Sequence, residues 1–197
     1  MFTGIVQSVG IIRVIEPSAG DVTIEVQTPA MSLESVAAGD SIAVNGVCLT
    51  VTGKDSDAFR ADVSRETLAM TTLGRWEPGT RVNLEKALLA GQPLGGHYVT
   101  GHVDGVGRVI GRRDDARSIR VEFEVPTPLA KYVARKGSVC VDGVSLTVNG
   151  VSGPRFDVNL VPHTLEVTIL GDYQPGTAVN IEVDIIARYL ERLSSHG

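Results

Sequence analysis

Small polar side chains that could bind a ligand recur along this 197-residue chain at an interval of 97 positions. The members of the two copies are Thr3, Cys48, Thr50, Asp62, Ser64 and Thr67, then Thr100, Ser145, Thr147, Asn159 and Thr164. Such groups supply hydrogen bonds rather than positive charge, so they suit an uncharged polar ligand better than a phosphate. Each residue alone also has a structural explanation, because Thr favours strands and Ser and Asn favour turns. Their recurrence favours binding.

Reactive chemistry is indicated where the two copies differ. The aligned pairs that differ in chemistry are Ile5 and His102, Cys48 and Ser145, Asn45 and Asp142, Glu66 and His163, and Ala87 and Asp184. These differences fit two ligands that are treated differently, and neutral drift after duplication is the alternative. An imidazole suits proton transfer near neutral pH, so His102 is the first candidate for that role, with a purely hydrogen-bonding role left open.

The repeat extends from end to end. Val44 to Val51 aligns with Val141 to Val148, and Pro78-Gly79-Thr80 aligns with Pro175-Gly176-Thr177. A period this long indicates a duplicated domain, because each copy is long enough to bury its own core. We expect a first domain at residues 1–97, a second at 98–185, and a C-terminal helix and tail at 186–197. Two similar sites fit chemistry on two similar molecules, unless duplication only enlarged the scaffold and one site survived.

Composition excludes several classes of protein. With 43% hydrophobic and 21% charged residues the chain is globular, and its net charge of -5 with scattered basic residues argues against nucleic acid and anionic membranes as partners. No stretch reaches the roughly 18 apolar residues of a membrane span, and the first residues lack a signal-peptide pattern. Cys48 and Cys140 are not at equivalent repeat positions, which excludes a duplicated disulfide or metal clip. Two free thiols favour the cytoplasm.

Short β-strands separated by turn residues dominate each half. Asn45-Gly46 and Asp142-Gly143 lie between strand-like residues and predict type I′ hairpins. Further strands are expected at 4–15, 22–27, 59–63 and 81–85, each with a counterpart 97 positions later. Five or six short strands per half favour a small antiparallel barrel, which closes without exposed edges. Short helical turns are expected at 30–37, 67–73 and 129–134.

One clear amphipathic helix is predicted at residues 185–193. Its apolar residues fall at helical spacing, with Arg188, Glu191 and Arg192 opposite them. Such a terminal helix either packs on its own barrel, which the pattern alone slightly favours, or joins subunits.

Several motifs together resemble the α chain of riboflavin synthase, in the lumazine-binding double-barrel family. They are Met1 to Val6, Asn45 to Val51, Glu66-Thr67-Leu68, Gly95-Gly96-His97, Gly101-His102-Val103, Lys136-Gly137, Asp142 to Val148 and Asn180 to Asp184. The resemblance covers nearly the whole chain. It implies an all-β fold of two tandem, similar, six-stranded antiparallel Greek-key barrels followed by a short C-terminal α-helix. The implied reaction is a dismutation of two 6,7-dimethyl-8-ribityllumazine molecules, without metal or cofactor, to riboflavin and 5-amino-6-ribitylaminouracil.

The resemblance also implies roles for individual residues. Those implied in catalysis are Phe2, Cys48, His102, Ser145 and Asp184. Phe2 is expected to close the site against water, and Cys48 or Ser145 to add to or hydrate the acceptor ring. Those implied in substrate binding are Gly4, Ile5, Val6, Cys48, Leu49, Thr50, Asp62, Val63, Ser64, Thr67, Gly101, His102, Val103, Lys136, Ser145, Leu146, Thr147, Asn159, Leu160, Val161, Pro162, His163 and Thr164.

Quaternary structure follows from the same resemblance. It implies a homotrimer held largely by C-terminal helices, with each active site formed by the first barrel of one subunit and the second barrel of its neighbour. Lys136 is expected to reach the neighbouring subunit's ligand, and lumazine synthase is a further candidate partner.

Other functions fit less well. Non-catalytic lumazine or flavin carriers share the double barrel, but their second half has lost its ligand-facing residues, which this chain keeps. A flavin-reductase barrel would need a nucleotide-binding α/β domain. The glycine-rich stretch at 101–107 is not followed by a helix pattern, and His97 and His102 lack a third metal ligand nearby in sequence.

Overall fold

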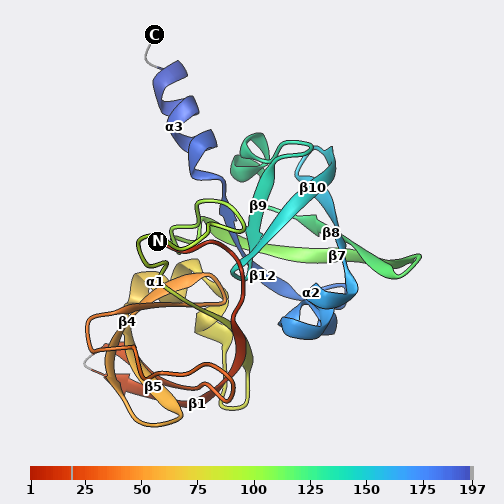
Figure 1. The fold of residues 1–197 in the computed structure, drawn as a ribbon. Helices are drawn as coiled ribbons and strands as arrows, with labels where there is room; N and C mark the ends of the chain where they lie inside the picture. The colour runs from red at the N-terminus through yellow and green to blue at the C-terminus, as the bar shows by residue number, and fades with distance from the viewer. Residues whose placement is uncertain (19, 196–197) are drawn as a thin grey trace.

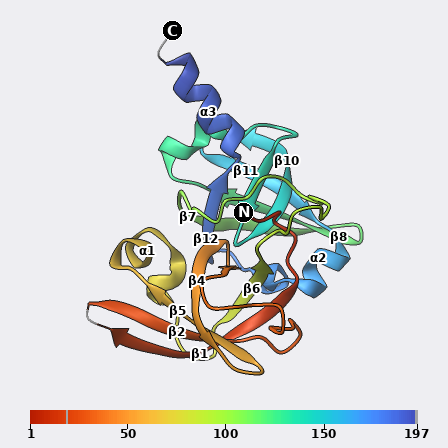
Figure 2. The ribbon, with the colours of Figure 1, turned by 60° about the vertical axis from the view of Figure 1, so that its left-hand side comes forward.

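The structure, a computed structural model, describes residues 1–18 and 20–195 and contains two closed six-stranded antiparallel barrels. In ring order the first consists of β1 (Ser8–Ser18), β2 (Asp21–Gln27), β5 (Ala58–Val63), β4 (Val47–Lys54), β3 (Ser41–Val44) and β6 (Arg81–Lys86). The second repeats this order with β7 (Gly105–Asp115), β8 (Ser118–Glu124), β11 (Arg155–Leu160), β10 (Val144–Ser152), β9 (Ser138–Val141) and β12 (Ala178–Val183). The predicted fold class is confirmed. Figures 1 and 2 show the barrels as two bodies with the N-terminus between them.

Each barrel has its own hydrophobic core, as the length of the repeat predicted. Strand residues alternate between core and surface: in β5, Phe59, Ala61 and Val63 are buried while Arg60 and Asp62 are exposed. In the second core Phe123 and Phe156 stack with ring centroids 5.2 Å apart. Period-two alternation therefore decides which side chains of a strand are available to a ligand.

The two predicted hairpins are present and also join the barrels. Asn45 and Gly46 have φ of 45° and 77°, and Asp142 and Gly143 have 43° and 79°, as a type I′ turn requires. The turns meet back to back, since a Cβ added to Gly46 would lie 2.8 Å from the Gly143 nitrogen. Side-chain bonds cross this contact in both directions. The Nδ2 atom of Asn83 donates to the carbonyl of Asp142 at 2.8 Å, and that of Asn180 to the carbonyl of Asn45 at 2.9 Å.

Short helices connect the last two strands of each barrel, β5 to β6 and β11 to β12. They are α1 (Arg65–Met70) and the 3-10 helix η1 (Thr72–Arg75), then α2 (Pro162–Val167) and η3 (Ile169–Asp172), with η2 (Thr127–Tyr132) between β8 and β9. The turns predicted near 67–73 and 129–134 overlap these elements. The prediction at 30–37 is wrong, because that segment forms bends and turns rather than a helix. Its side chains Met31, Leu33 and Val36 pack into the first core. The first strand begins at Ser8 rather than at residue 4, because the preceding residues contact the second barrel instead.

The terminal helix α3 (Ile185–Ser194) points away from both barrels (Figures 1 and 2). Its apolar side chains are exposed, with Tyr189 at 66% and Leu193 at 75%, so its apolar face is not packed on its own barrel as the pattern had slightly favoured. Polar contacts join α3 to the second barrel along one side, where Arg188 meets Asp104 and, one turn further, Glu191 meets Lys131 and Tyr132. The tail residues 196–197 of the predicted C-terminal segment lie outside the described residues. Within residues 1–18 and 20–195, no helix is long and apolar enough to cross a membrane.

Candidate functional site

The predicted polar residues lie on the outer wall of each barrel. On β4 and β5, Leu49 and Val63 point into the core, whereas their sequence neighbours point outward. We call the outward set of Cys48, Thr50, Asp62 and Ser64 the Cys48 face. The repeat gives an equivalent Ser145 face, which consists of Ser145, Thr147, Asn159 and Val161, with Leu146 and Leu160 pointing inward. Leu49, Val63, Leu146 and Leu160 therefore offer a ligand only their backbone.

Each face is completed by a segment from the other half of the chain. The Cys48 nitrogen donates to the Gly101 carbonyl at 2.9 Å, and the Ser145 nitrogen donates to the Gly4 carbonyl at 2.8 Å. Val6 packs against the second core and Val103 against the first. The predicted polar residues of each half therefore lie on their own barrel, and only the segments 4–6 and 101–103 cross to the other barrel. Residues 4–6 belong with the Ser145 face and 101–103 with the Cys48 face, which is why no strand starts at residue 4.

Two buried glutamates hold the exchanged segments. Glu85 on β6 accepts hydrogen bonds from the Thr3 nitrogen and hydroxyl, both at 2.7 Å, and from the Gly4 nitrogen at 3.0 Å. Glu182 on β12 accepts the same three bonds from Thr100 and Gly101, at 2.6, 2.8 and 2.9 Å. Burial raises the pKa of both carboxyls, against the lowering effect of these donors. Thr3 and Thr100 thus anchor these segments, while their contact with a ligand stays a prediction. The recurring glutamates were a sequence signal that was missed.

Glycine is required where each segment meets its face. Gly4 and Gly101 have φ of +76° and +80°, and a Cβ on either would lie 2.6 Å from the Cβ of Ser145 or Cys48 respectively. Phe2 is fully buried beside them with Ala43, Val99 and Cys140. Its ring packs behind Cys48. The expected role of Phe2 in closing the site against water stays a prediction.

The remaining predicted residues surround the two faces. Ser64 caps α1 and accepts from the Thr67 nitrogen at 3.2 Å, while Asp62 accepts from the Thr23 hydroxyl at 2.7 Å. Others are exposed or half-buried: Ile5, His102, Val103 and Lys136 in loops, and Pro162, His163 and Thr164 at the start of α2. Among the described residues, Lys136 makes no hydrogen bond to a member of either face.

A buried histidine that the predictions did not include lies directly behind Ser145. The His97 Nδ1 atom is 2.6 Å from the Ser145 hydroxyl, and His97 is 8% exposed. Burial lowers the pKa of His97, and the nearby carboxylate of Asp184 opposes that shift. Asp184 itself caps α3 by accepting from the Ile186 nitrogen at 3.0 Å. The Gly95-Gly96-His97 motif was visible in the sequence, but its partner is 48 positions away.

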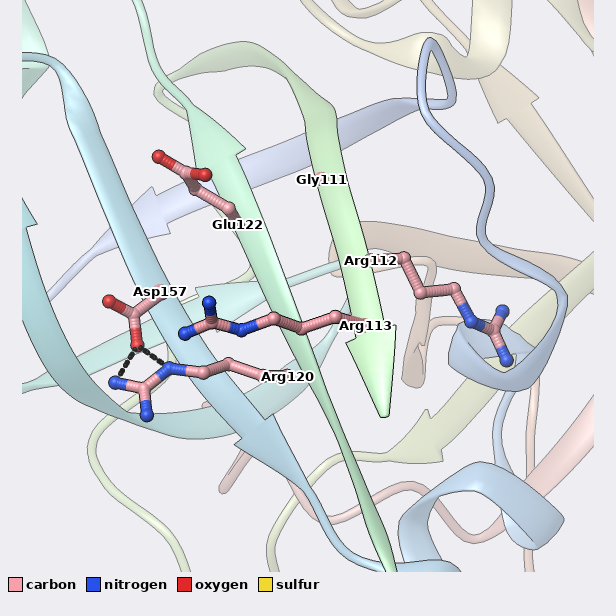
Figure 3. A pocket seen from close by; sticks show the side chains of 6 residues that line it. All are labelled: Gly111, Arg112, Arg113, Arg120, Glu122 and Asp157. Atoms are coloured by element: carbon pink, nitrogen blue, oxygen red, sulfur yellow. Dashed lines mark hydrogen bonds and ion pairs between the residues drawn. The ribbon is translucent and has the colours of Figure 1, made fainter. Parts of the chain in front are cut away.

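Two hollows on the surface differ in whether predicted site residues line them. One of about 260 Å³ lies beside His102 and is lined by Thr100, Val103, Glu182 and the base of α3. Another of about 380 Å³ lies on the second barrel and has charged walls, where Figure 3 shows Arg113 and Arg120 extending side by side while Arg112 points away. Arg120 pairs with Asp157 at 2.6 Å. None of the predicted site residues lines this second hollow, so we do not assign it to the ligand.

Two barrels with paired polar faces define a tandem-barrel ligand-binding protein. The family model described as "Lumazine binding domain" matches residues 3–87 and 100–184, one match per barrel. The chain belongs to this family.

Relatives within the family carry the name riboflavin synthase. The protein from Photobacterium phosphoreum is 48% identical over 98% of this chain and 88% of its own length. Those from Brucella abortus and Mycobacterium bovis are 42% and 46% identical, over 100% and 98% of this chain and 99% and 98% of theirs. Among solved structures, LumP complexed with 6,7-dimethyl-8-(1'-D-ribityl) lumazine is 30% identical, with a TM-score of 0.83 over 93% of this chain and 99% of LumP. LumP complexed with riboflavin has a TM-score of 0.85 at the same identity and coverage.

Proposed function

We propose that this chain is a riboflavin synthase. It converts two 6,7-dimethyl-8-ribityllumazine molecules into riboflavin and 5-amino-6-(D-ribitylamino)uracil by transfer of a four-carbon unit. The observation that carries the proposal is that both faces are complete: each has its outward polar strand residues and its own glycine segment, held by its own buried glutamate. Two equivalent sites per chain fit a reaction between two copies of one substrate.

The chemistry of the faces suits this substrate. A lumazine has a flat, electron-poor ring with carbonyl and nitrogen edges and a polyhydroxylated tail, and hydroxyl, amide and backbone groups bind such edges. The methyl group beside the electron-poor ring is weakly acidic, because its carbanion delocalises into the ring. His102, exposed at the Cys48 face, serves the proton transfer of the molecule bound there. Holding two rings in reacting order supplies the larger part of the rate enhancement, on the order of 7 to 11 kcal/mol.

The alternative function is a non-catalytic carrier, because the LumP structures bind a lumazine and riboflavin in the same fold. The retained Ser145 face favours the enzyme, since a carrier needs only one ligand site. The relatives named riboflavin synthase are also more similar, at 38% to 48% identity against 30% for LumP.

A single assay separates these functions. Purified protein supplied with the lumazine alone should produce riboflavin, measured by its absorbance, whereas a carrier gives a bound complex and no riboflavin. Replacing His102 with Gln should keep ligand affinity and slow turnover by about 10² to 10⁴, the usual loss for a missing general acid or base. Unchanged turnover at saturating substrate would remove His102 from the mechanism.

Assembly completes the proposal. The exposed apolar side of α3 supports a homotrimer in which three such helices bury one another, and each active site then pairs the Cys48 face of one subunit with the Ser145 face of the next. Lys136 reaches the neighbour's ligand in that arrangement.

Two cysteines without a disulfide support a cytoplasmic location. Association with lumazine synthase is checked by co-sedimentation of the two purified proteins.

A further inference from the structure

Ser145 and Cys48 occupy equivalent positions on the two faces, but only Ser145 has an imidazole behind it. The Ser145 hydroxyl is 2.6 Å from the His97 Nδ1 atom, whereas the Cys48 thiol has no hydrogen-bond partner in the part of the chain that the structure describes. The two faces therefore differ in the ability to move a proton. This difference is independent of the exposed His102.

The packing around His97 fixes the ring in place. Its backbone nitrogen donates to the Thr3 carbonyl at 3.1 Å, and Thr3 is bound in turn by Glu85. Gly96 has no room for a side chain, since a Cβ there would lie 2.1 Å from the Thr3 carbonyl and 3.1 Å from the Ser145 hydroxyl. The remaining ring nitrogen, Nε2, is buried and is without a partner among the described residues. Among the described side chains, Ser145 is thus the one with which His97 can exchange a proton.

We propose that His97, acting through the Ser145 hydroxyl, receives the proton lost by the methyl group of the lumazine bound on the Ser145 face. This inference rests on the proposed synthase function. The Ser145 oxygen takes the proton from the methyl carbon while its own proton passes to Nδ1 of His97, so the products are a carbanion delocalised into the lumazine ring and an imidazolium. The reverse transfer returns the proton later in the cycle.

The surroundings of His97 support a neutral ring at rest and a stabilised cation after transfer. Burial lowers the pKa of His97, which keeps the imidazole unprotonated and able to accept a proton. Asp184, at the start of α3, is the charged group that favours the imidazolium, and Glu85 is linked to His97 only through Thr3. His97 is a positioning and proton-storing residue, while Ser145 contacts the ligand.

The test measures proton exchange separately from synthesis. The substrate lumazine is incubated in D₂O with the full-length protein, and loss of its methyl proton signal is followed by NMR beside riboflavin formation. His97→Asn keeps a hydrogen-bonding group near the Nδ1 position but cannot accept a proton. We expect exchange and turnover to fall by about 10² or more with little change in KM, and the acidic limb of the kcat profile to disappear.

Ser145→Ala provides the matched second variant, because this half-buried side chain lies outside the hydrophobic core and its loss does not open that core. It should lose as much exchange as His97→Asn, and the double variant should lose no more than either single variant, since both changes break one relay. Retained exchange in a folded His97→Asn, or losses that multiply in the double variant, would overturn the relay. A wild-type protein that makes no riboflavin would instead overturn the proposed function.

Discussion

Asp142 is the buried carboxyl at the contact between the barrels, and replacing it with Asn should change how stability depends on pH. Its Oδ1 accepts from the Asn180 nitrogen at 2.7 Å and its Oδ2 from the Tyr173 hydroxyl at 2.5 Å, yet burial raises its pKa from 3.8 to about 7. Asn45 occupies the same place in the first barrel and accepts from the Asn83 nitrogen at 2.6 Å. An amide at position 142 can keep both contacts, with its NH₂ donating to the Tyr173 oxygen.

The size and sign of the effect follow from the raised pKa. The folded chain binds this proton more tightly than the unfolded chain, so the contribution of Asp142 to stability is greatest in acid and is lost as the pH rises through about 7. A pKa of about 7 against 3.8 corresponds to about 4 kcal/mol of unfolding free energy. About 2 to 3 kcal/mol of this develops between pH 5 and pH 8.

Denaturant unfolding of both proteins at several pH values measures the effect. The advantage of Asp142→Asn over wild type should grow by about 2 to 3 kcal/mol from pH 5 to pH 8, because the amide carries no charge to bury. Asn45→Asp is the matched control. Its stability relative to wild type should fall as the pH rises, because it adds a second buried carboxyl. A difference between wild type and Asp142→Asn that is constant across this range would refute the reasoning.

Other expected outcomes concern assembly and the anchored segments. Deleting residues 186–197 should yield monomers with intact barrels and greatly reduced turnover, measured by sedimentation and riboflavin formation, because no residue of α3 is buried within the chain. An active monomer would contradict both the trimer and the shared site. Glu182→Gln should weaken lumazine binding, since an amide cannot accept all three bonds from Thr100 and Gly101 as a carboxylate does. Isothermal titration measures that loss, and unchanged affinity would show that the anchor is not needed.

Local patterns in the sequence predicted the parts of the fold that local chemistry decides. Asn45-Gly46 and Asp142-Gly143 specify their hairpins because few other dipeptides adopt two consecutive positive φ angles at low cost. The recurrence of these turns at one period then predicted two similar barrels. The apolar spacing in residues 185–193 likewise predicted α3 but not what covers it, because the partner of an amphipathic face is not encoded in its period.

The arrangement of the site could not be predicted in this way. Whether residues 4–6 lie on the first or the second barrel depends on contacts with Ser145, which is more than a hundred positions away. The contact of His97 with Ser145 is equally non-local. The repeat suggested self-contained halves, and an alignment cannot distinguish these from halves that exchange a segment, since both arrangements keep the same residues at the same spacing.

The exchanged segments allow the two faces to be disabled one at a time. In Gly4→Ala the new Cβ is 2.6 Å from Ser145 and should disrupt the Ser145 face, whereas in Gly101→Ala it is 2.6 Å from Cys48 and 2.9 Å from the supporting Phe2 ring and should disrupt the Cys48 face. Gly79→Ala is the control, because φ there is +95° and nothing lies within 4 Å, so it carries the backbone cost of about 1 to 2 kcal/mol without the contact. Titration with a non-reactive lumazine analogue should then give two sites per chain in wild type and in the control, and one in each face variant.

Turnover in the same variants tests how the faces combine. Each face variant alone should be nearly inactive, because one lumazine has no second molecule positioned beside it. If the Cys48 face of one subunit works with the Ser145 face of its neighbour, then unfolding and refolding the two variants together should restore part of the activity, since a mixed trimer contains an intact pair of faces. Variants that stay inactive after mixing, while wild type treated in the same way recovers, would place both faces of an active site within one chain.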